Sequence, residues 1–315
     1  MSNIKLIEYS DSHKKAWDTL VDSSFNGTFM HTRDFLDYHG DKFLDHSTLF
    51  YKDDKICAVF PAARIDNNLI SHPGATVGGL VFNDTVRGAD IYEILLLHKN
   101  HYKNLNFIYK STPVEFQRHA ISDDIWGLFR IGAVKTGCEI STILNPLMTN
   151  YCYWPDKAAE INSYTNNIVF QAMPLHNLEF IQHFWSSVVI PNLQKYEVEP
   201  THSPEDIHYL YSRFPVFIKG LYATYKDTDK ILGGVIIFRF NKCYHVQYSV
   251  TTSKGRALNV LTFLHHYMIT NLPSDVHYYN FGKSTEDRGH FLNESLYYYK
   301  NGFGGGSMNY DTYQY

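Results

Sequence analysis

The sequence lacks paired cysteines and blocks of like charge. Its four cysteines, Cys57, Cys138, Cys152 and Cys243, are widely spaced, and none belongs to a Cys-x-x-Cys pair. This spacing argues against a structural zinc site and a disulfide framework, and it predicts buried, reduced thiols. The net charge is -4, and the charges of either sign are scattered. The basic surface of a nucleic-acid-binding protein is therefore missing, and we expect no nucleic-acid partner.

Long apolar runs and metal-ligand clusters are also missing. The longest apolar run, residues 231–238, is far too short to cross a bilayer, and residues 1–9 lack the basic and apolar regions of a signal peptide. Among 17 histidines, His98 and His101 have helical spacing, but no carboxylate or cysteine at matching spacing completes a site. We expect a cytoplasmic protein without membrane insertion and without a metal.

The length and composition of the chain fit two domains. The 315 residues exceed the length at which one hydrophobic core stops growing, and a hydrophobic content of 44% is enough to pack two domains. The aromatic share of 16% suits either deep pockets or tyrosine-rich cores.

An internal repeat supports two domains. Residues 51–56 (Tyr-Lys-Asp-Asp-Lys-Ile) resemble residues 225–231 (Tyr-Lys-Asp-Thr-Asp-Lys-Ile), and each segment lies between apolar runs, which predicts two β-hairpins. A Lys-Ser-Thr triplet follows at nearly equal distances, starting at Lys110 and at Lys283. The chain is thus predicted to hold two similar α/β units.

The remaining elements of each unit follow from apolar spacing. Helices are predicted over residues 89–102 and 257–270, and a further helix over 175–196 opens the second unit. The predicted domains are 1–145, a linker over 146–164 and 165–315.

A strand over residues 244–250 leads into a loop that suits a phosphate group. Alternation predicts one polar face, made by His245, Gln247 and Ser249, and an opposite face that includes Tyr248. The loop over 251–257 opens a helix directly, so free backbone N–H groups and the helix dipole would meet a pyrophosphate. Lys254 and Arg256 add positive charge, although Thr252 and Ser253 are equally suited to cap the helix.

Two other segments contain polar residues that are candidates for a functional site. The first repeat has a glycine loop over 71–79 with His72 and no basic residue, so it is predicted to line the acceptor side of a cleft. The polar run over 280–304 follows a strand, where open α/β sheets place ligands, and it contains Ser284, Thr285, Glu286 and Asn293. A helix is predicted over 291–300.

These residues resemble the FemAB-like branch of the GNAT acyltransferase superfamily. Gly255 and Ala257 match the end of its coenzyme A loop, Gln/Arg-x-x-Gly-x-Gly/Ala, whereas Thr252 departs from its start. Further matches span nearly the full length: Phe29-x-His31-x-Arg33-x-Phe35-Leu36-x-Tyr38-His39, Ser71-His72-Pro73-Gly74, Phe281-Gly282-x-Ser284-Thr285-Glu286 and Lys300-x-x-Phe303-Gly304. Val77 and Asn301 depart from the pattern, which puts fine specificity in doubt.

The resemblance implies two tandem GNAT-like domains, each a mixed, mostly antiparallel sheet flanked by helices. It implies transfer of a short acyl group from acyl-CoA, such as acetyl-CoA or 3-hydroxybutanoyl-CoA, to the amine of a nucleotide-linked amino-deoxy sugar for surface polysaccharide. Cell-wall peptide relatives use aminoacyl-tRNA instead, but the acidic charge balance favours acyl-CoA. A non-enzymatic sugar-binding protein is the alternative from another class.

The resemblance also implies roles for residues in direct attack of the amine on the thioester. Backbone N–H groups near residues 249–251 would hold the thioester carbonyl, and His72, His245 and Glu286 are candidate bases, with Tyr248 as candidate acid. Each has a structural alternative, such as core packing for Tyr248. The predicted coenzyme A contacts are Ser249, Val250, Thr251, Thr252, Ser253, Lys254, Gly255, Arg256 and Ala257. The predicted substrate contacts are His31, Arg33, Ser284, Thr285, Asn293 and Lys300, with an Arg33–Asp45 ion pair as the alternative to phosphate binding.

Overall fold

The structure is a computed structural model that describes residues 4–164 and 166–315. The chain divides into two compact units. Unit 1 contains the chain up to Ser141 together with Lys283–Asn293 and Met308–Tyr315, and unit 2 contains Thr142–Gly282 and Glu294–Ser307. The predicted division into 1–145, 146–164 and 165–315 stays a prediction.

Unit 1 is built on a small antiparallel sheet in the order β1-β3-β4-β7. Its strands are β1 Ile4–Glu8, β3 Thr48–Lys52, β4 Lys55–Phe60 and β7 Val81–Phe82. Its helices are α1 Lys14–Ser23, α2 Arg33–Asp37, α3 Ala89–His101 and α4 Asp123–Arg130. Outside this sheet, a parallel β6–β8 pair and antiparallel β2–β5, β5–β6 and β8–β17 pairs form, with β2 Leu44–Asp45, β5 Ala63–Ile65, β6 Asn68–Ile70, β8 Asn106–Lys110, β9 Val134–Leu144 and β17 Gly306–Gln314.

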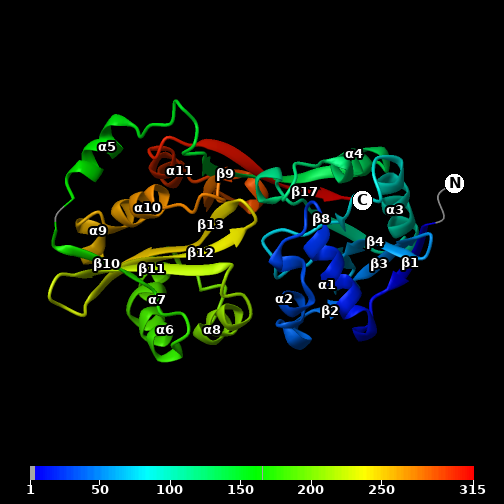
Figure 1. The fold of residues 1–315 in the computed structure, drawn as a ribbon, viewed down its shortest axis with the longest axis horizontal. Coiled ribbons are helices and arrows are strands. Elements are labelled where there is room, and N and C mark those ends of the chain that lie inside the picture. Colours follow the sequence, from blue (N-terminus) through cyan, green and yellow to red (C-terminus); the bar gives the residue numbers. More distant parts are fainter. Residues whose placement is uncertain (1–3, 165) are drawn as a thin grey trace. The chain divides into compact units, whose positions relative to one another are not determined.

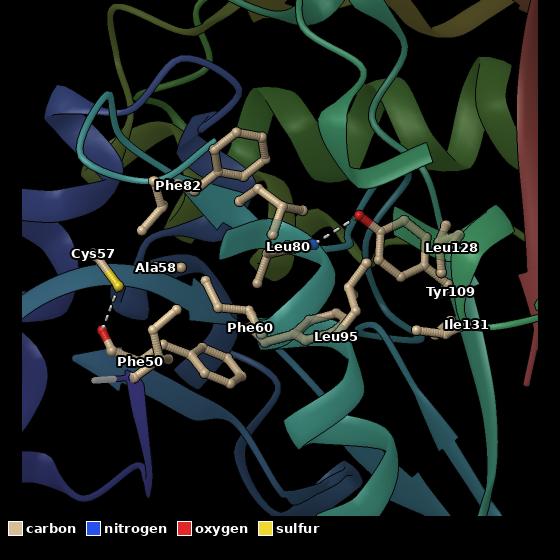
Figure 2. Packing of buried hydrophobic residues seen from close by; sticks show 14 of the residues in the cluster. Phe50, Cys57, Ala58, Phe60, Leu80, Phe82, Leu95, Tyr109, Leu128 and Ile131 are labelled. Carbon is tan, nitrogen blue, oxygen red and sulfur yellow. Dashed lines mark hydrogen bonds between the residues drawn. The ribbon is translucent and has the colours of Figure 1, made fainter. Parts of the chain in front are cut away.

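The core of unit 1 lies between this sheet and α3. Figure 2 shows Phe50 and Phe60 of the β3–β4 hairpin, Phe82 of β7 and Leu95 of α3 in one apolar cluster. Tyr109 of β8 enters the same cluster and binds the backbone N–H of Leu80 through its hydroxyl. The burial of these large side chains stabilises the unit.

The cysteine prediction is half right. Cys57 and Cys243 are buried and reduced, as expected. Cys138 and Cys152 are reduced but exposed, so the expectation of burial was wrong for them.

Unit 2 repeats this plan in a larger form. Its strands β10 Ile168–Ala172, β11 Ile218–Tyr225, β12 Ile231–Phe240 and β13 Cys243–Thr251 pair antiparallel in that order, and β14 Tyr278–Lys283 pairs parallel with β13. Its helices are α5 Pro155–Asn162, α6 Leu178–Phe184, α7 Ile190–Leu193, α8 Pro204–Arg213, α9 Ser253–Ala257, α10 Val260–Thr270 and α11 Glu294–Asn301. In Figure 1, α9 and α10 cover one face of these strands, and α6, α7 and α8 cover the other.

Both predicted hairpins are confirmed as antiparallel pairs, β3–β4 and β11–β12. Asp53 and Asp54 in the first turn and Asp227 in the second take positive φ values of 50°, 61° and 58°, which Asp tolerates better than most residues. After each hairpin come an antiparallel strand, a helix and a further strand. The order of elements therefore repeats, as the sequence repeat predicts.

The four predicted helices agree with the structure to different degrees. The helix over 89–102 is confirmed as α3, and the one over 175–196 is a continuous helical run in which a π-turn, Trp185–Val189, joins α6 to α7. The helix over 257–270 is wrong at its start, because Asn259 adopts a left-handed conformation that separates α9 from α10. The helix over 291–300 begins only at Glu294, since Phe291–Leu292 forms strand β16 against β15 Thr285–Glu286.

Candidate functional site

Strands β13 and β14 of unit 2 separate after a short stretch of parallel pairing. Their register covers Cys243↔Tyr278, Tyr244↔Tyr279 and His245↔Asn280, whereas β13 continues to Thr251. The edge of β13 beyond His245 therefore has no β14 partner within the described residues. Such an edge presents backbone N–H and C=O groups to a ligand, although the N–H of Thr251 already donates to Asn192 Oδ1 at 3.1 Å. We call this edge, residues 246–251, the open edge.

A β-bulge at Gln247 changes which side chains share a face. Ile237 pairs with Val246 and Ile236 with Tyr248, so Gln247 is the extra residue. Ser249, opposite Val235, thus lies on the α10 face, whereas Tyr248 packs on Trp185 on the other face. The predicted polar face of His245, Gln247 and Ser249 is wrong, because the alternation it assumed is interrupted. The buried Gln247 Oε1 has no hydrogen-bond partner.

The bulge brings Ser249 to a buried histidine that the sequence reasoning missed. Ser249 Oγ lies 2.9 Å from His265 Nε2, and His265 Nδ1 lies 2.7 Å from the hydroxyl of Tyr279. Burial, with smaller contributions from Lys300 and Lys157, lowers the pKa of His265 to about 3. His265 stands among the apolar residues of the helix over 260–270, where a core histidine is the ordinary interpretation, so the only signal was a polar residue on an apolar face.

The loop after β13 closes tightly onto the sheet. Thr252 caps α9 by accepting a hydrogen bond from Gly255 N at 3.0 Å, so the predicted capping role is present. A Cβ at Gly255 would lie 2.1 Å from the Leu232 carbonyl oxygen, which makes glycine necessary there. The exposed side chains of Lys195, Lys254 and Arg256 surround this turn. The loop therefore combines a close backbone approach with positive charge.

His245 and Asn280 form the pair at which the two strands part. His245 Nδ1 lies 2.8 Å from Asn280 Oδ1, which also accepts the N–H of Gly282 at 2.9 Å. Because an amide oxygen only accepts, Nδ1 carries the proton and Nε2 the lone pair in neutral His245. This geometry suits a base oriented by an amide.

Tyr248 is held in the packing of the opposite face. Its hydroxyl lies 3.0 Å from both the backbone N and Nδ1 of His202, and burial raises its pKa to about 12. These contacts favour the packing interpretation over a proton donor.

Lys300 places a buried amine in unit 2. It donates to the Gly282 carbonyl oxygen at 2.9 Å, and burial lowers its pKa to about 7. The amine thus titrates near neutrality next to the glycine of the strand β14.

Unit 1 holds a pocket of about 50 Å³, lined by Arg33, Leu36, Asp37, His39, Gly40, Phe43, Asp45, Ala63 and His72. Arg33 is buried and forms ion pairs with Asp37 at 2.5 Å and Asp45 at 2.6 Å. Its guanidinium also stacks 3.7 Å from the centre of the Tyr9 ring. The ion-pair alternative for Arg33 is therefore present, and two carboxylates would oppose a phosphate.

Burial keeps two histidines of this region, His31 and His72, neutral. Burial lowers the pKa of His72 to about 2 and that of His31 to about 4. His72 packs 4.8 Å from His39, and its buried Nδ1 has no hydrogen-bond partner. His31 Nε2 lies 3.3 Å from the Gly78 carbonyl oxygen. Both predicted residues thus reach the glycine loop, but His72 is a weak proton acceptor.

The polar run after β14 belongs to both units. Ser284, Thr285, Glu286 and Asn293 lie in unit 1, whereas Lys300 lies in unit 2. Within the described residues, the buried hydroxyls of Ser284 and Thr285 have no hydrogen-bond partner, and Glu286 is exposed in β15. Glu286 Oε1 lies 3.5 Å from Asn293 Nδ2, directly before α11.

In residues 4–164 and 166–315, no group of three or more His, Cys, Asp or Glu side chains is arranged to hold a metal ion. No helix in the same part of the chain has the length and apolar character needed to cross a membrane.

Comparison with solved structures finds this fold in other proteins. A crystal structure of FemX matches with a TM-score of 0.69 and 9% identity, covering 99% of this chain and 97% of that one. The C-terminal domain of a putative lysylphosphatidylglycerol synthetase from Agrobacterium fabrum matches with a TM-score of 0.63 and 9% identity, covering 96% and 91%. L-PGS from Bacillus licheniformis matches with a TM-score of 0.60 and 13% identity, covering 97% and 92%. The predicted fold class is confirmed.

No protein-family model matches the sequence, and no curated protein matches it.

Proposed function

We propose that this protein is an acyl-CoA-dependent N-acyltransferase that acylates the amine of a nucleotide-linked amino-deoxy sugar. The observation that carries the proposal is the open edge of β13, which ends in the tight, positively charged turn at Gly255. A pantetheine arm carries amide groups that pair with a strand edge, and a pyrophosphate is stabilised by cations and backbone N–H groups. A fold shared with FemX supports a group-transfer enzyme.

The residues of unit 2 supply the chemistry that this reaction needs. The backbone at the Gln247 bulge would meet the thioester carbonyl, since a bulge redirects N–H groups away from the regular ladder. His245, oriented by Asn280, takes the proton from the incoming ammonium group, so that a neutral amine attacks the thioester directly.

The pocket of unit 1 offers groups that suit sugar hydroxyls. Asp37 and Asp45 offer carboxylate oxygens beside the aromatic ring of Phe43 and the imidazole of His72. Carboxylates accept hydrogen bonds from sugar hydroxyls, whereas they repel a phosphate. We therefore replace the predicted phosphate contact of Arg33 with a role in holding these two carboxylates.

A binding and turnover experiment tests the proposal. Calorimetry with coenzyme A should show micromolar binding, and acetyl-CoA or 3-hydroxybutanoyl-CoA should release free thiol when dTDP- or UDP-amino sugars are added. His245→Gln should lower the turnover about 100-fold or more, within the range for loss of a general base. His208→Gln on α8, whose exposed ring binds a backbone carbonyl, is the matched control. Absence of both binding and thiol release would sink the proposal, and alanyl-tRNA supporting transfer instead would favour the FemX-like alternative.

A further inference from the structure

Ser249, His265 and Tyr279 form a hydrogen-bonded chain that leads from the core of unit 2 to the open edge. His265 and Tyr279 are 1% and 0% exposed, whereas Ser249 is only partly buried. The two hydrogen bonds, 2.9 Å and 2.7 Å, are the only ones the described structure gives to these three side chains. The chain therefore has one buried end and one accessible end.

The buried hydroxyl of Tyr279 decides which atom donates in each of the two hydrogen bonds. If His265 Nδ1 donated to Tyr279, the phenolic proton of Tyr279 would be left without an acceptor in a fully buried position. If Tyr279 donates to Nδ1, every buried donor is satisfied, because Nε2–H then donates to Ser249 Oγ. In this arrangement the hydroxyl proton of Ser249 points away from His265 and is free to reach another acceptor.

The surroundings of His265 argue against its use as a base that would make Ser249 a nucleophile. Lys300 and Lys157 act on His265 electrostatically, and both disfavour an imidazolium ion. Its second partner is a phenol, whereas the carboxylate of a catalytic triad would stabilise the charged ring. His265 is thus suited to remain neutral and to donate.

We propose that the Ser249 hydroxyl donates a proton to the leaving thiolate of the acyl thioester, and that His265 and Tyr279 are positioning residues that orient it. The inference rests on the proposed function. As the amine nitrogen bonds to the carbonyl carbon, the C–S bond breaks and its electron pair leaves with sulfur. Ser249 gives its proton to sulfur while its oxygen takes one from the newly bonded nitrogen, which yields an amide and a free thiol. The Nε2–H of His265 stabilises the negative charge on Oγ during this exchange.

Substitution of Ser249 tests the role kinetically. With acetyl-CoA, Ser249→Ala should lower kcat about 100-fold or more and change KM for acetyl-CoA less than about threefold, because a proton donor acts in the transition state. Ser249→Thr, which keeps the hydroxyl, should retain kcat within about tenfold. Ser212→Ala on α8 is the control, since its exposed hydroxyl binds only the carbonyl of Tyr209.

A change of leaving group separates this role from a structural one. The acetyl thioester of an acidic aryl thiol needs no proton on its sulfur, so the deficit of Ser249→Ala should shrink to less than about tenfold with that donor. An equal deficit with both donors would overturn the inference, as would an unchanged kcat with acetyl-CoA. A wild-type chain that binds no acetyl-CoA overturns the proposed function and the inference together. If the wild type and Ser249→Ala both transfer acetyl at the same rate, the inference alone is overturned.

The tautomer gives a readout that needs no acceptor substrate. Nitrogen NMR of the wild type should show His265 protonated at Nε2, and Tyr279→Phe should shift it toward a mixture with Nδ1–H. Tyr279→Phe should also lower kcat less than Ser249→Ala does, because it removes only the orientation. Protonation at Nδ1 in the wild type would overturn the inference.

Discussion

Tyr109 in unit 1 and Gly282 in unit 2 occupy the same place in the repeat, directly before the Lys-Ser-Thr triplet. In unit 1 the Tyr109 ring packs against Gly79, where an added Cβ would lie 2.6 Å from Cζ, and its hydroxyl accepts the Leu80 N–H. In unit 2 the nearest atoms to a Cβ at Gly282 would be Val246 O at 3.4 Å and His245 Cε1 at 3.6 Å. Unit 1 thus fills the space at this position with a side chain, whereas unit 2 has only the glycine there.

The difference shows how two units with the same order of elements come to differ in their backbone contacts. Tyr109 connects the backbone before β7 to Asp124 of α4 through a 2.6 Å hydrogen bond. Unit 1 thereby satisfies its backbone internally. Unit 2 exposes the equivalent edge, and it follows that edge with two cations, Lys254 and Arg256, where the loop at His72 has none.

The largest expected effect comes from closing the open edge. Gly282→Tyr should weaken coenzyme A binding about 100-fold or more, roughly 2.7 kcal/mol, because the ring would occupy the space beside Val246. Gly282→Ala is the control, since the positive φ of 75° strains both variants but the methyl group leaves most of the space free. Calorimetry measures both affinities. Equal affinities in the two variants would show that the glycine serves the backbone conformation alone.

The second prediction removes the hydroxyl of Tyr109 in unit 1. Tyr109→Phe leaves the Leu80 N–H without its acceptor and Asp124 without its donor, both in buried positions. We expect a loss of about 2–4 kcal/mol of unfolding free energy by urea titration. Tyr298→Phe, at an exposed tyrosine that donates to Asp156, should cost less than about 0.5 kcal/mol. Similar losses in both variants would contradict the internal role of Tyr109.

The third prediction compares a buried lysine in each unit. Burial lowers the pKa of Lys110 in unit 1 and of Lys300 in unit 2 to about 7, against 10.5 in the unfolded chain. Between these values the unfolded state binds more protons, so each lysine makes the unfolding free energy rise with pH, by about 1.4 kcal/mol per unit.

Replacing these lysines separates their contributions. Lys110→Met and Lys300→Met should each flatten the rise between pH 7 and 10, which denaturant titrations at several pH values measure. We expect only Lys300→Met to change acyl transfer as well, because Lys300 donates to Gly282 at the proposed site. A steep rise that persists in the double variant would contradict both assignments.

The elements predicted correctly from the sequence are those whose signals lie in neighbouring residues. The Asp-Lys turns specify both hairpins, and the apolar spacing of 89–102 specifies α3, because these signals lie within a few residues. The bulge at Gln247 depends on how β13 pairs with Ile236 and Ile237, and a one-residue shift reverses every face after it. For the same reason the contact of Ser249 with His265 was not visible in the sequence. Asn259 was the one missed local signal, since Asn favours left-handed positions.

The smallest expected effect concerns the charges of the turn at Gly255. Lys254→Ala and Arg256→Ala should each weaken coenzyme A binding by about 0.5–1 kcal/mol at low salt, because both side chains are exposed and screened. Lys55→Ala in the hairpin turn of unit 1 makes the same change in net charge. No ligand is proposed near Lys55, so this variant should leave the affinity unchanged. A loss that disappears at high salt locates the pyrophosphate near these cations. A loss of equal size in Lys55→Ala would instead indicate that net charge alone attracts coenzyme A, and the contrast between the two loops would carry no information about binding.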